Sequence, residues 1–333
     1  MPDTDRLDRS AIDDDVRWAL FQQVANRRSG RQNLRDIVPI LGAGFVIQAT
    51  MEAGNPRIVD WSRILKETAA RFRCPRAMAA LESDVPGQTT LVWDLMTVEL
   101  ARTLGDQAAH RQELKMRKDL ATRLRNDDET RRLARPFVQR FLGLGFHDLA
   151  STNFDSVLLP DGVKPERWAH GARQAVSLAA ACGPTRIWYP HGHVVEPGSI
   201  VLGTRAYGRL LEPINAAFRA HALLPKPRRT VGLDTWVATM LERPIVFIGL
   251  SLTREEWTLW WLLSQRARFL ARRRAHVPQA FVFAHRPANN GSADALAAFR
   301  TLARTCQLLG LHLLAFDDFP AGWERLKAAL SGA

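Results

Sequence analysis

Short apolar runs separated by amphipathic segments make up most of the chain after residue 144. Helical periodicity falls between several of these runs, over 207–223, 233–241, 255–274, 293–309 and 320–330. Strands that alternate with helices predict an α/β fold, in which helices cover both faces of a mostly parallel sheet. The predicted strands are 37–41, 146–152, 186–189, 200–202, 245–248, 280–284 and 311–316.

The chain between residues 60 and 143 has a different pattern and is expected to be almost wholly helical. Such a block is too long for one crossover helix, so we interpret it as a helical subdomain inserted between strands. At the N-terminus, an acidic tail over 1–15 is expected to be mobile, and a helix is predicted over 13–27. We therefore divide the chain into a tail and helix (1–30) and one large domain (31–333). The helices predicted in the insertion are 61–72, 76–81, 90–104, 108–124 and 128–142.

Composition narrows the class of protein. The chain has 333 residues, of which 46% are hydrophobic and 24% charged, as in ordinary globular proteins. No apolar run approaches the roughly 18–20 residues of a membrane span, and the Asp-rich start does not resemble a signal peptide. A cytoplasmic protein that does not contact membranes is expected. Three cysteines (Cys74, Cys182 and Cys306) cannot form a four-cysteine zinc site, so we expect reduced thiols and no metal.

The net charge of 46 − 34 = +12 favours contact with polyanions. Two interpretations stay open: a solvated basic face, or a docking surface for nucleic acid or an acidic partner protein. No zinc-finger or aromatic RNA-binding motif accompanies the basic residues. The two basic patches consist of Lys226, Arg228 and Arg229, and of Arg266, Arg268, Arg272, Arg273 and Arg274.

A glycine pair follows the first predicted strand, in the sequence Gly42-Ala43-Gly44-Phe45. Because glycine has no side chain, backbone amides at such a turn can approach a diphosphate closely. A single Gly-x-Gly is also common in simple tight turns, and the third glycine of the usual dinucleotide fingerprint is missing.

The next strand is followed by Thr152-Asn153-Phe154-Asp155. Ligands of open α/β sheets bind beyond the carboxyl ends of the strands, where these side chains are expected. The Asn153 amide can hold a ribose hydroxyl and orient a water, and Asp155 can anchor the loop. The competing interpretation is a helix cap, because Asn and Asp are both good caps.

Two further motifs lie at predicted strand ends. His191-Gly192 follows the strand 186–189, and a histidine there suits general-base chemistry, although His193 is a rival for the role. Gly249-Leu250-Ser251 follows the most apolar strand and can offer amides and a hydroxyl to a phosphate or ribose. A packed histidine and an ordinary strand-to-helix turn are the alternatives.

Taken together, these motifs resemble the sirtuin-like fold, and more narrowly the sirtuin-like NAD+ hydrolases of bacterial antiphage defence. The resemblance spans roughly residues 37–331 in islands, of which Thr-Asn-x-Asp and His-Gly are the most specific. It implies a Rossmann-like NAD+ domain in which activity depends on Asn153 and His191. The cofactor-binding residues it implies are Gly42, Ala43, Gly44, Phe45, Thr152, Asp155, Gly249 and Ser251.

Two departures from the family pattern bear on function. Val46 stands where the family's first motif usually carries a serine, which removes one hydroxyl contact to the cofactor. The four-cysteine zinc module of protein deacylases is absent, which argues for attack by water rather than peptide deacylation. We therefore expect an NAD+ glycohydrolase that releases nicotinamide and ADP-ribose.

An enzyme that empties the NAD+ pool should be inactive until triggered, as in abortive infection. We expect activation by a partner protein, by homo-oligomer assembly or by a small ligand. The stretch 257–263, in which only Thr258 is polar, is either buried internally or packed against another subunit. The alternatives are a module that senses NAD+ or ADP-ribose without turnover, and a basic protein that binds nucleic acid.

Overall fold

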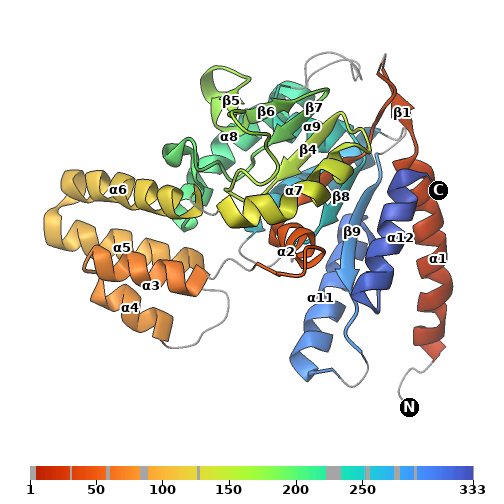
Figure 1. The fold of residues 1–333 in the computed structure, drawn as a ribbon, viewed down its shortest axis with the longest axis horizontal. Helices are drawn as coiled ribbons and strands as arrows, with labels where there is room; N and C mark the ends of the chain where they lie inside the picture. Colours follow the sequence, from red (N-terminus) through yellow and green to blue (C-terminus); the bar gives the residue numbers. More distant parts are fainter. Residues whose placement is uncertain are drawn as a thin grey trace.

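A computed structural model describes residues 5–30, 32–57, 61–82, 89–125, 128–222, 234–250, 252, 256–273, 278–288 and 291–332. Its centre is an eight-stranded sheet in the order β10-β9-β8-β3-β4-β7-β6-β5 (Figure 1). The pairs from β10 to β7 are parallel, and β6 and β5 form an antiparallel edge. The strands are β3 (Val38–Leu41), β4 (Asp148–Ser151), β5 (Glu166–Arg167), β6 (Leu178–Cys182), β7 (Thr185–Trp188), β8 (Ile245–Ile248), β9 (Ala280–His285) and β10 (His312–Phe316).

The strand order places a topological switch point between β3 and β8. From the central strand β3 the chain moves to one side for β4 and β7, and then crosses to the other side of β3 for β8, β9 and β10. Leu41 is in register with both Ser151 and Ile248, so the carboxyl ends of three strands are level. This doubly wound order, in which ligands bind at the switch point, confirms the predicted Rossmann-like α/β fold.

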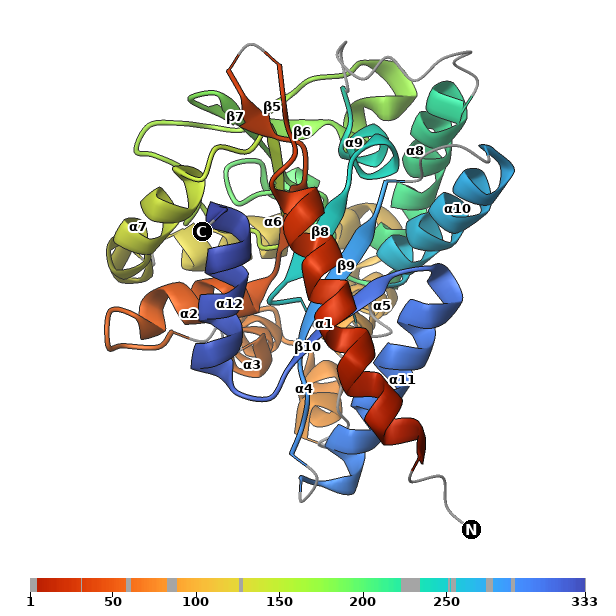
Figure 2. The ribbon, with the colours of Figure 1, turned by 90° about the vertical axis from the view of Figure 1, so that its right-hand side faces the viewer.

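The sheet is apolar on both faces because helices cover both. Every residue of β3 and β8 is buried, as the continuous apolar runs predicted. One face packs against α1 (Asp5–Ala25), α2 (Ala43–Met51), α7 (Asp128–Leu142) and α12 (Phe319–Ser331). The other packs against α8 (Thr204–Ala222), α9 (Trp236–Glu242), α10 (Trp257–Arg273) and α11 (Ala293–Leu309) (Figure 2).

Four helices between β3 and β4 stand away from the sheet (Figure 1) and have a hydrophobic cluster of their own. That cluster also takes in Phe154, Val194, Ile200 and Leu202, which lie in loops beyond the carboxyl ends of β4 and β7. The fifth helix of the block, α7, packs on the sheet instead. The inserted helices therefore support the loops that carry the candidate residues. They are α3 (Trp61–Arg71), α4 (Pro75–Glu82), α5 (Thr89–Leu104) and α6 (Asp106–Arg125).

Two predictions about local structure were wrong, and one strand was not predicted. The N-terminal helix begins at Asp5, within the tail that we expected to be mobile, and its later residues Trp18 and Phe21 are buried on the sheet. The run 200–202 is no strand. It is buried because it packs beside the inserted helices, and the Val201 amide donates to the His191 carbonyl at 2.8 Å. The alanine-rich strand β6 was missed because alanine favours helices.

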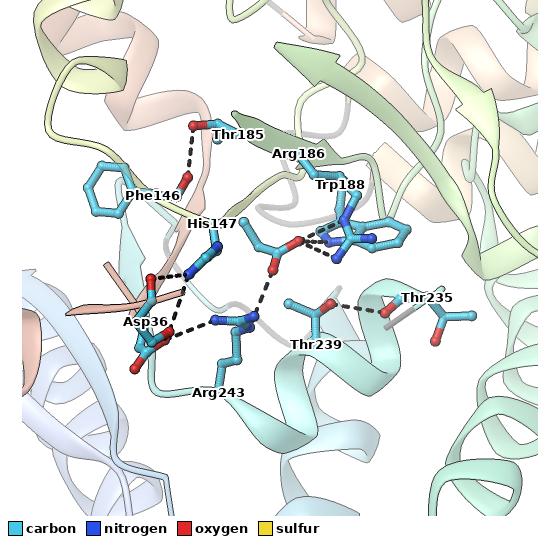
Figure 3. Close-up of polar contacts among 11 residues, drawn as sticks. Asp36, Phe146, His147, Thr185, Arg186, Trp188, Thr235, Thr239 and Arg243 are labelled. Carbon is cyan, nitrogen blue, oxygen red and sulfur yellow. Dashed lines mark hydrogen bonds and ion pairs between the residues drawn. The ribbon is translucent and has the colours of Figure 1, made fainter. Parts of the chain in front are cut away.

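A charge network closes the amino-terminal edge of the sheet (Figure 3). Asp148, which is 1% exposed, accepts hydrogen bonds from Arg186 Nε at 2.8 Å and from Trp188 Nε1 at 3.0 Å. Arg243 Nε lies 3.3 Å from the other Asp148 oxygen, and Arg243 Nη1 lies 3.2 Å from Asp36. Asp36 in turn accepts from Ser29. Side chains from both sides of the switch point are thus tied together beneath the sheet.

The three cysteines are free and at least partly buried. Burial raises the pKa of the Cys74 thiol to about 11 and that of Cys306 to about 12, and it also raises the pKa of Cys182. Thiols held in the protonated form are poor nucleophiles and poor metal ligands. Within the described ranges, no three His, Cys, Asp or Glu side chains gather as metal ligands would, and none of the helices there has the length and apolarity to span a bilayer.

Candidate active site

Glycines meet at the switch point because two backbones touch there. The Gly42 amide donates to the Ile248 carbonyl at 3.0 Å, and the Gly44 amide donates to the Gly249 carbonyl at 2.9 Å. A Cβ on Gly42 would lie 2.4 Å from the Gly249 oxygen. A Cβ on Gly249, whose φ is +66°, would lie 2.3 Å from the Phe45 nitrogen. The glycine turns are therefore required by the chain's own contact between β3 and β8.

The residues after the first glycine begin helix α2. The Phe45 amide donates to the Gly42 carbonyl at 3.1 Å, and its ring packs edge-on against Phe137 and Phe141 at 5.2 and 4.9 Å. Phe45 and Val46 both belong to the main core. Any contact of Phe45 with a ligand would therefore come from its backbone. Ala43 lies at the start of α2, where its amide is one of the first of the helix.

The loop after β4 is anchored to β3. The Thr152 amide and hydroxyl donate to the Leu41 carbonyl at 2.9 and 3.3 Å. Asn153 is half-buried, and its backbone N–H donates to Ser151 Oγ at 3.2 Å. Asp155 Oδ1 accepts from the Val157 amide at 2.9 Å. No helix begins in this described loop, so the alternative of a helix cap is wrong, and Asp155 stabilises a turn.

His191 is almost completely enclosed, with 4% of its side chain exposed. Its Nε2 lies 3.2 Å from Glu256 Oε2, and its ring meets the Tyr207 ring edge-on at 5.6 Å. The N···O distance is that of a hydrogen bond but the angles are not, and both atoms are buried without another hydrogen-bond partner. The two atoms are therefore close without a hydrogen bond, and both keep hydrogen-bonding capacity for a ligand.

His193, the rival histidine, has a structural role. It is fully buried, its Nδ1 accepts from the Val195 amide at 3.2 Å, and its Nε2 lies 3.3 Å from Ser156 Oγ. Its ring packs against Tyr189 at 4.5 Å. Burial lowers the pKa of His193 to about 4, so the ring is neutral at pH 7. An amide donor on one nitrogen and a hydroxyl on the other leave it no position for a substrate proton.

The structure joins the loops of Asn153 and His191 directly. The Val194 amide donates to the Phe154 carbonyl at 2.9 Å, and His193 contacts Ser156 across the same junction. Gly192, whose φ is +87°, lets the second loop turn, since a Cβ there would lie 2.1 Å from the Ser199 carbonyl oxygen. Two segments far apart in the sequence thus lie side by side beyond the carboxyl ends of β4 and β7.

Glu256 is the site residue that the sequence did not reveal. It directly precedes α10, at the helix end where a carboxylate is favoured by the helix dipole. An acidic residue at the start of a predicted helix is the one signal that was present, and this signal suggests capping rather than chemistry. Ser251, in the same loop after β8, lies outside the described residues.

The structure also bears on the basic patches and the tryptophan-rich stretch. Arg266 is buried, not at the surface as expected, and donates to the Met240 carbonyl at 2.9 Å. Its burial lowers the guanidinium pKa to about 10. In the stretch 257–263, Leu259, Leu262 and Leu263 are buried within the chain. Residues 226–229 and the side chains of residues 272–274 lie outside the described part.

Two cavities among the described residues lie elsewhere. One lies against α6 and α8, and the other is an open groove along α3, α5 and α6. Neither is lined by Asn153, His191 or Gly249. His191 itself is buried, with Glu256 and Tyr207 against its ring.

The segment that carries these residues was compared with known protein families. Residues 147–303 match the family model of the SIR2-like domain. Members of this family are NAD-dependent enzymes, and the match supports a sirtuin-type, NAD-related domain over these residues. The SIR2-like match covers just under half of the chain, from the start of β4 into α11, and includes Asn153, His191 and Gly249. No curated protein matches the chain.

Proposed function

We propose that this protein is an NAD+ glycohydrolase that cleaves the bond between nicotinamide and ribose. The observation that carries the proposal is the hydrogen-bonded junction between the Asn153 and His191 loops, within the SIR2-like segment and beyond the sheet's carboxyl edge. Water as the acceptor is supported by the cysteine count, because three cysteines cannot form the zinc module of protein deacylases.

The residues present suit the chemistry of this cleavage. The bond between ribose C1′ and the nicotinamide nitrogen breaks with its electron pair going to nicotinamide, which leaves as a neutral molecule. Positive charge builds on the ribose, as in glycoside hydrolysis, and a water oxygen then bonds to C1′. The Asn153 amide would hold a ribose hydroxyl and the water, and His191 would accept the proton of the water or of a ribose hydroxyl.

Glu256 would determine which nitrogen of His191 accepts the proton. A neutral imidazole has one N–H and one bare nitrogen, and a carboxylate 3.2 Å from Nε2 favours the proton on that nitrogen. Nδ1 would then be the proton acceptor. After proton transfer, the same carboxylate would stabilise the imidazolium.

The direct test is incubation of the purified protein with NAD+ and chromatography of nicotinamide and ADP-ribose. We expect Asn153→Ala and His191→Ala each to lower the rate at least about 100-fold, the low end for a lost acid–base group. Gln307→Ala and His170→Ala, at exposed positions outside the site, are the controls and should retain activity. Full turnover by both site variants would contradict the proposal.

We propose further that the enzyme is a triggered effector of antiphage defence, activated by a partner protein or by self-association. The burial of His191 supports a resting state, since its Nε2 lies against Glu256. Expression in bacteria should lower cellular NAD+ once the trigger is present, and His191→Ala should abolish this. NAD+ levels that stay unchanged during phage infection, with wild type and variant alike, would contradict the effector role.

One observation favours a second candidate, a domain that binds NAD+ or ADP-ribose without turnover. Val46, which stands where the family's first motif usually carries a serine, lies in the core and offers no hydroxyl to the cofactor. Such a module would bind NAD+ and release no nicotinamide with any activator. Nicotinamide release that depends on His191 would exclude it.

A further inference from the structure

The smaller of the two cavities, which lies against α6 and α8, is found where the inserted helices meet the SIR2-like segment. It has a volume of about 240 Å³ and is lined by α6, α8 and the 3-10 turn at 197–199 with the residues that follow it. Its lining is basic: four arginines and His110 face it, against one carboxylate, Glu113. None of these residues belongs to the site described above.

Two of the four arginines are already neutralised. Arg117 Nη2 lies 2.8 Å from Glu113, and Arg167 Nη2 lies 2.6 Å from Glu196. Arg205 and Arg209 are exposed, and within the described residues neither has an ion pair or a hydrogen bond. The cavity therefore presents two uncompensated positive charges.

The placement of these two arginines is unfavourable without a ligand. They stand four residues apart on α8, where like charges repel. Arg205 also lies in the first turn of the helix, at the positive end of its dipole. Asp94 offsets part of this, because its Oδ2 accepts from the Thr204 amide at 2.7 Å, but it does not pair with Arg205 or Arg209. A bound anion would relieve both effects.

The charge and the size of the cavity indicate which class of anion it could bind. A phosphate monoester carries about −1.5 to −2 charges at pH 7, which matches two free guanidinium groups, and arginine binds phosphate through paired N–H donors. Ligand pockets for drug-sized molecules measure roughly 300–1,000 Å³, so a cavity of about 240 Å³ is too small for a dinucleotide. Leu114 and Leu210 add an apolar wall suited to a sugar or base.

We propose that this cavity binds a small phosphate monoester of at most mononucleotide size, through Arg205 and Arg209. The cavity shares its wall with the His191 loop. Val201, in that wall, donates its amide to the His191 carbonyl at 2.8 Å, and α8 also carries Tyr207, whose ring contacts His191 at 5.6 Å. The ligand would therefore shift the position of His191 and regulate turnover. This regulatory part rests on the proposed function, whereas the binding part does not.

The binding test is titration calorimetry of the full chain with inorganic phosphate and with 5′-AMP. We expect AMP to bind and the double variant Arg205→Gln/Arg209→Gln to weaken binding about 100-fold, about tenfold for each lost charged contact. Arg219→Gln, on the same helix but outside the cavity, is the matched control and should bind like wild type. If phosphate binds too, the phosphate group carries recognition; if AMP alone binds, the nucleoside contributes.

Folding of the double variant is checked by its melting temperature without ligand. Removal of two repelling charges should leave this temperature equal to or slightly above that of wild type. Equal AMP affinity in wild type and the double variant would place binding elsewhere and overturn the proposal, as would no binding of either probe at millimolar concentration.

The regulatory part is tested by NAD+ turnover with and without AMP. A change of at least about threefold in wild type and Arg219→Gln, and none in the double variant, supports it. An unchanged rate with AMP bound overturns the regulation and leaves the binding site intact. AMP binding that needs Arg205 and Arg209, in a protein without NAD+ turnover under any condition, would refute the proposed function and leave the cavity assignment standing.

Discussion

The two edges of the central sheet pair their buried polar groups to different degrees. At the amino-terminal edge, Asp148 accepts hydrogen bonds from Arg186 and Trp188 and forms an ion pair with Arg243 (Figure 3), although Arg243 Nε itself makes no hydrogen bond. At the carboxyl edge, His191 Nε2 and Glu256 Oε2 lie 3.2 Å apart and neither atom makes a hydrogen bond. A hydrogen-bonded buried carboxylate stabilises a fold, whereas a buried pair in which neither atom is hydrogen-bonded is costly. We therefore expect the amino-terminal edge to contribute more to stability, and the carboxyl edge to keep polar atoms available for a ligand.

The largest effect is expected when the Asp148 network at the amino-terminal edge is broken. Asp148→Ala leaves Arg186 and Arg243 without their shared carboxylate, and the loss of one partner of a buried pair costs about 3–5 kcal/mol of unfolding free energy. Chemical denaturation measures it. Asp161→Ala, which removes exposed pairs with Arg131 and Arg135, should cost about 1 kcal/mol or less. Equal costs for the two variants would remove the distinction between this network and ordinary surface pairs.

Acidification should destabilise the fold through His193, which lies at the carboxyl edge of the sheet. Burial holds the pKa of His193 at about 4, below the 6.5 of an unfolded histidine, so between these values only the unfolded chain binds the proton. Stability is therefore lost as the pH falls from 6.5 to 4, by about 3 kcal/mol at most. His193→Gln should flatten that part of the profile of unfolding free energy against pH. An identical slope in both proteins would show that His193 is not buried as described.

A glycine at the contact between the two turns should contribute more to folding stability than a glycine that is required only for its positive φ. Gly249→Ala forces a Cβ to 2.3 Å from the Phe45 nitrogen, and such overpacking costs about 1–3 kcal/mol beyond the backbone strain. Gly162→Ala, at φ +80° with open space around it, carries the strain alone, about 1 kcal/mol. The difference between their melting temperatures measures the contact. No difference would mean that β3 and β8 do not touch at the switch point.

The smallest effect is expected at the residue that sequence reasoning missed. Glu256→Gln keeps the size of the side chain and removes the charge beside His191 Nε2, which should slow NAD+ hydrolysis about tenfold. The melting temperature should change little, because the wild-type contact lacks hydrogen-bond geometry. A variant with full activity but a lower melting temperature would move Glu256 from the chemistry of the site to its stability.

Much of the scaffold was predictable because it depends on local patterns. Parallel strands buried on both faces read as continuous apolar runs, so β3, β8, β9 and β10 were recognised, as were the helices between strands. Shorter apolar stretches also revealed β4 and β7, although Asp148 and Arg186 lie within them. The motifs at 42–44, 152–155, 191–192 and 249–251 were found because glycine and polar residues interrupt such runs. The roles of Asn153 and His191 stay predictions, and they rest on the family resemblance rather than on periodicity.

Other features depended on contacts between distant segments. The run 200–202 has the composition of a strand, but it packs against the inserted helices and not in the sheet. His191 and His193 stand two residues apart in one loop, and only packing decides that His193 is enclosed by Tyr189 and Ser156. Arg205 shows no pattern that would single it out, and the position of Glu256 at a helix start suggests only capping. Local sequence thus determined the strands, their ends and the fold class, whereas the partner of each polar group was decided by tertiary structure, because burial and charge pairing depend on residues far apart in the chain.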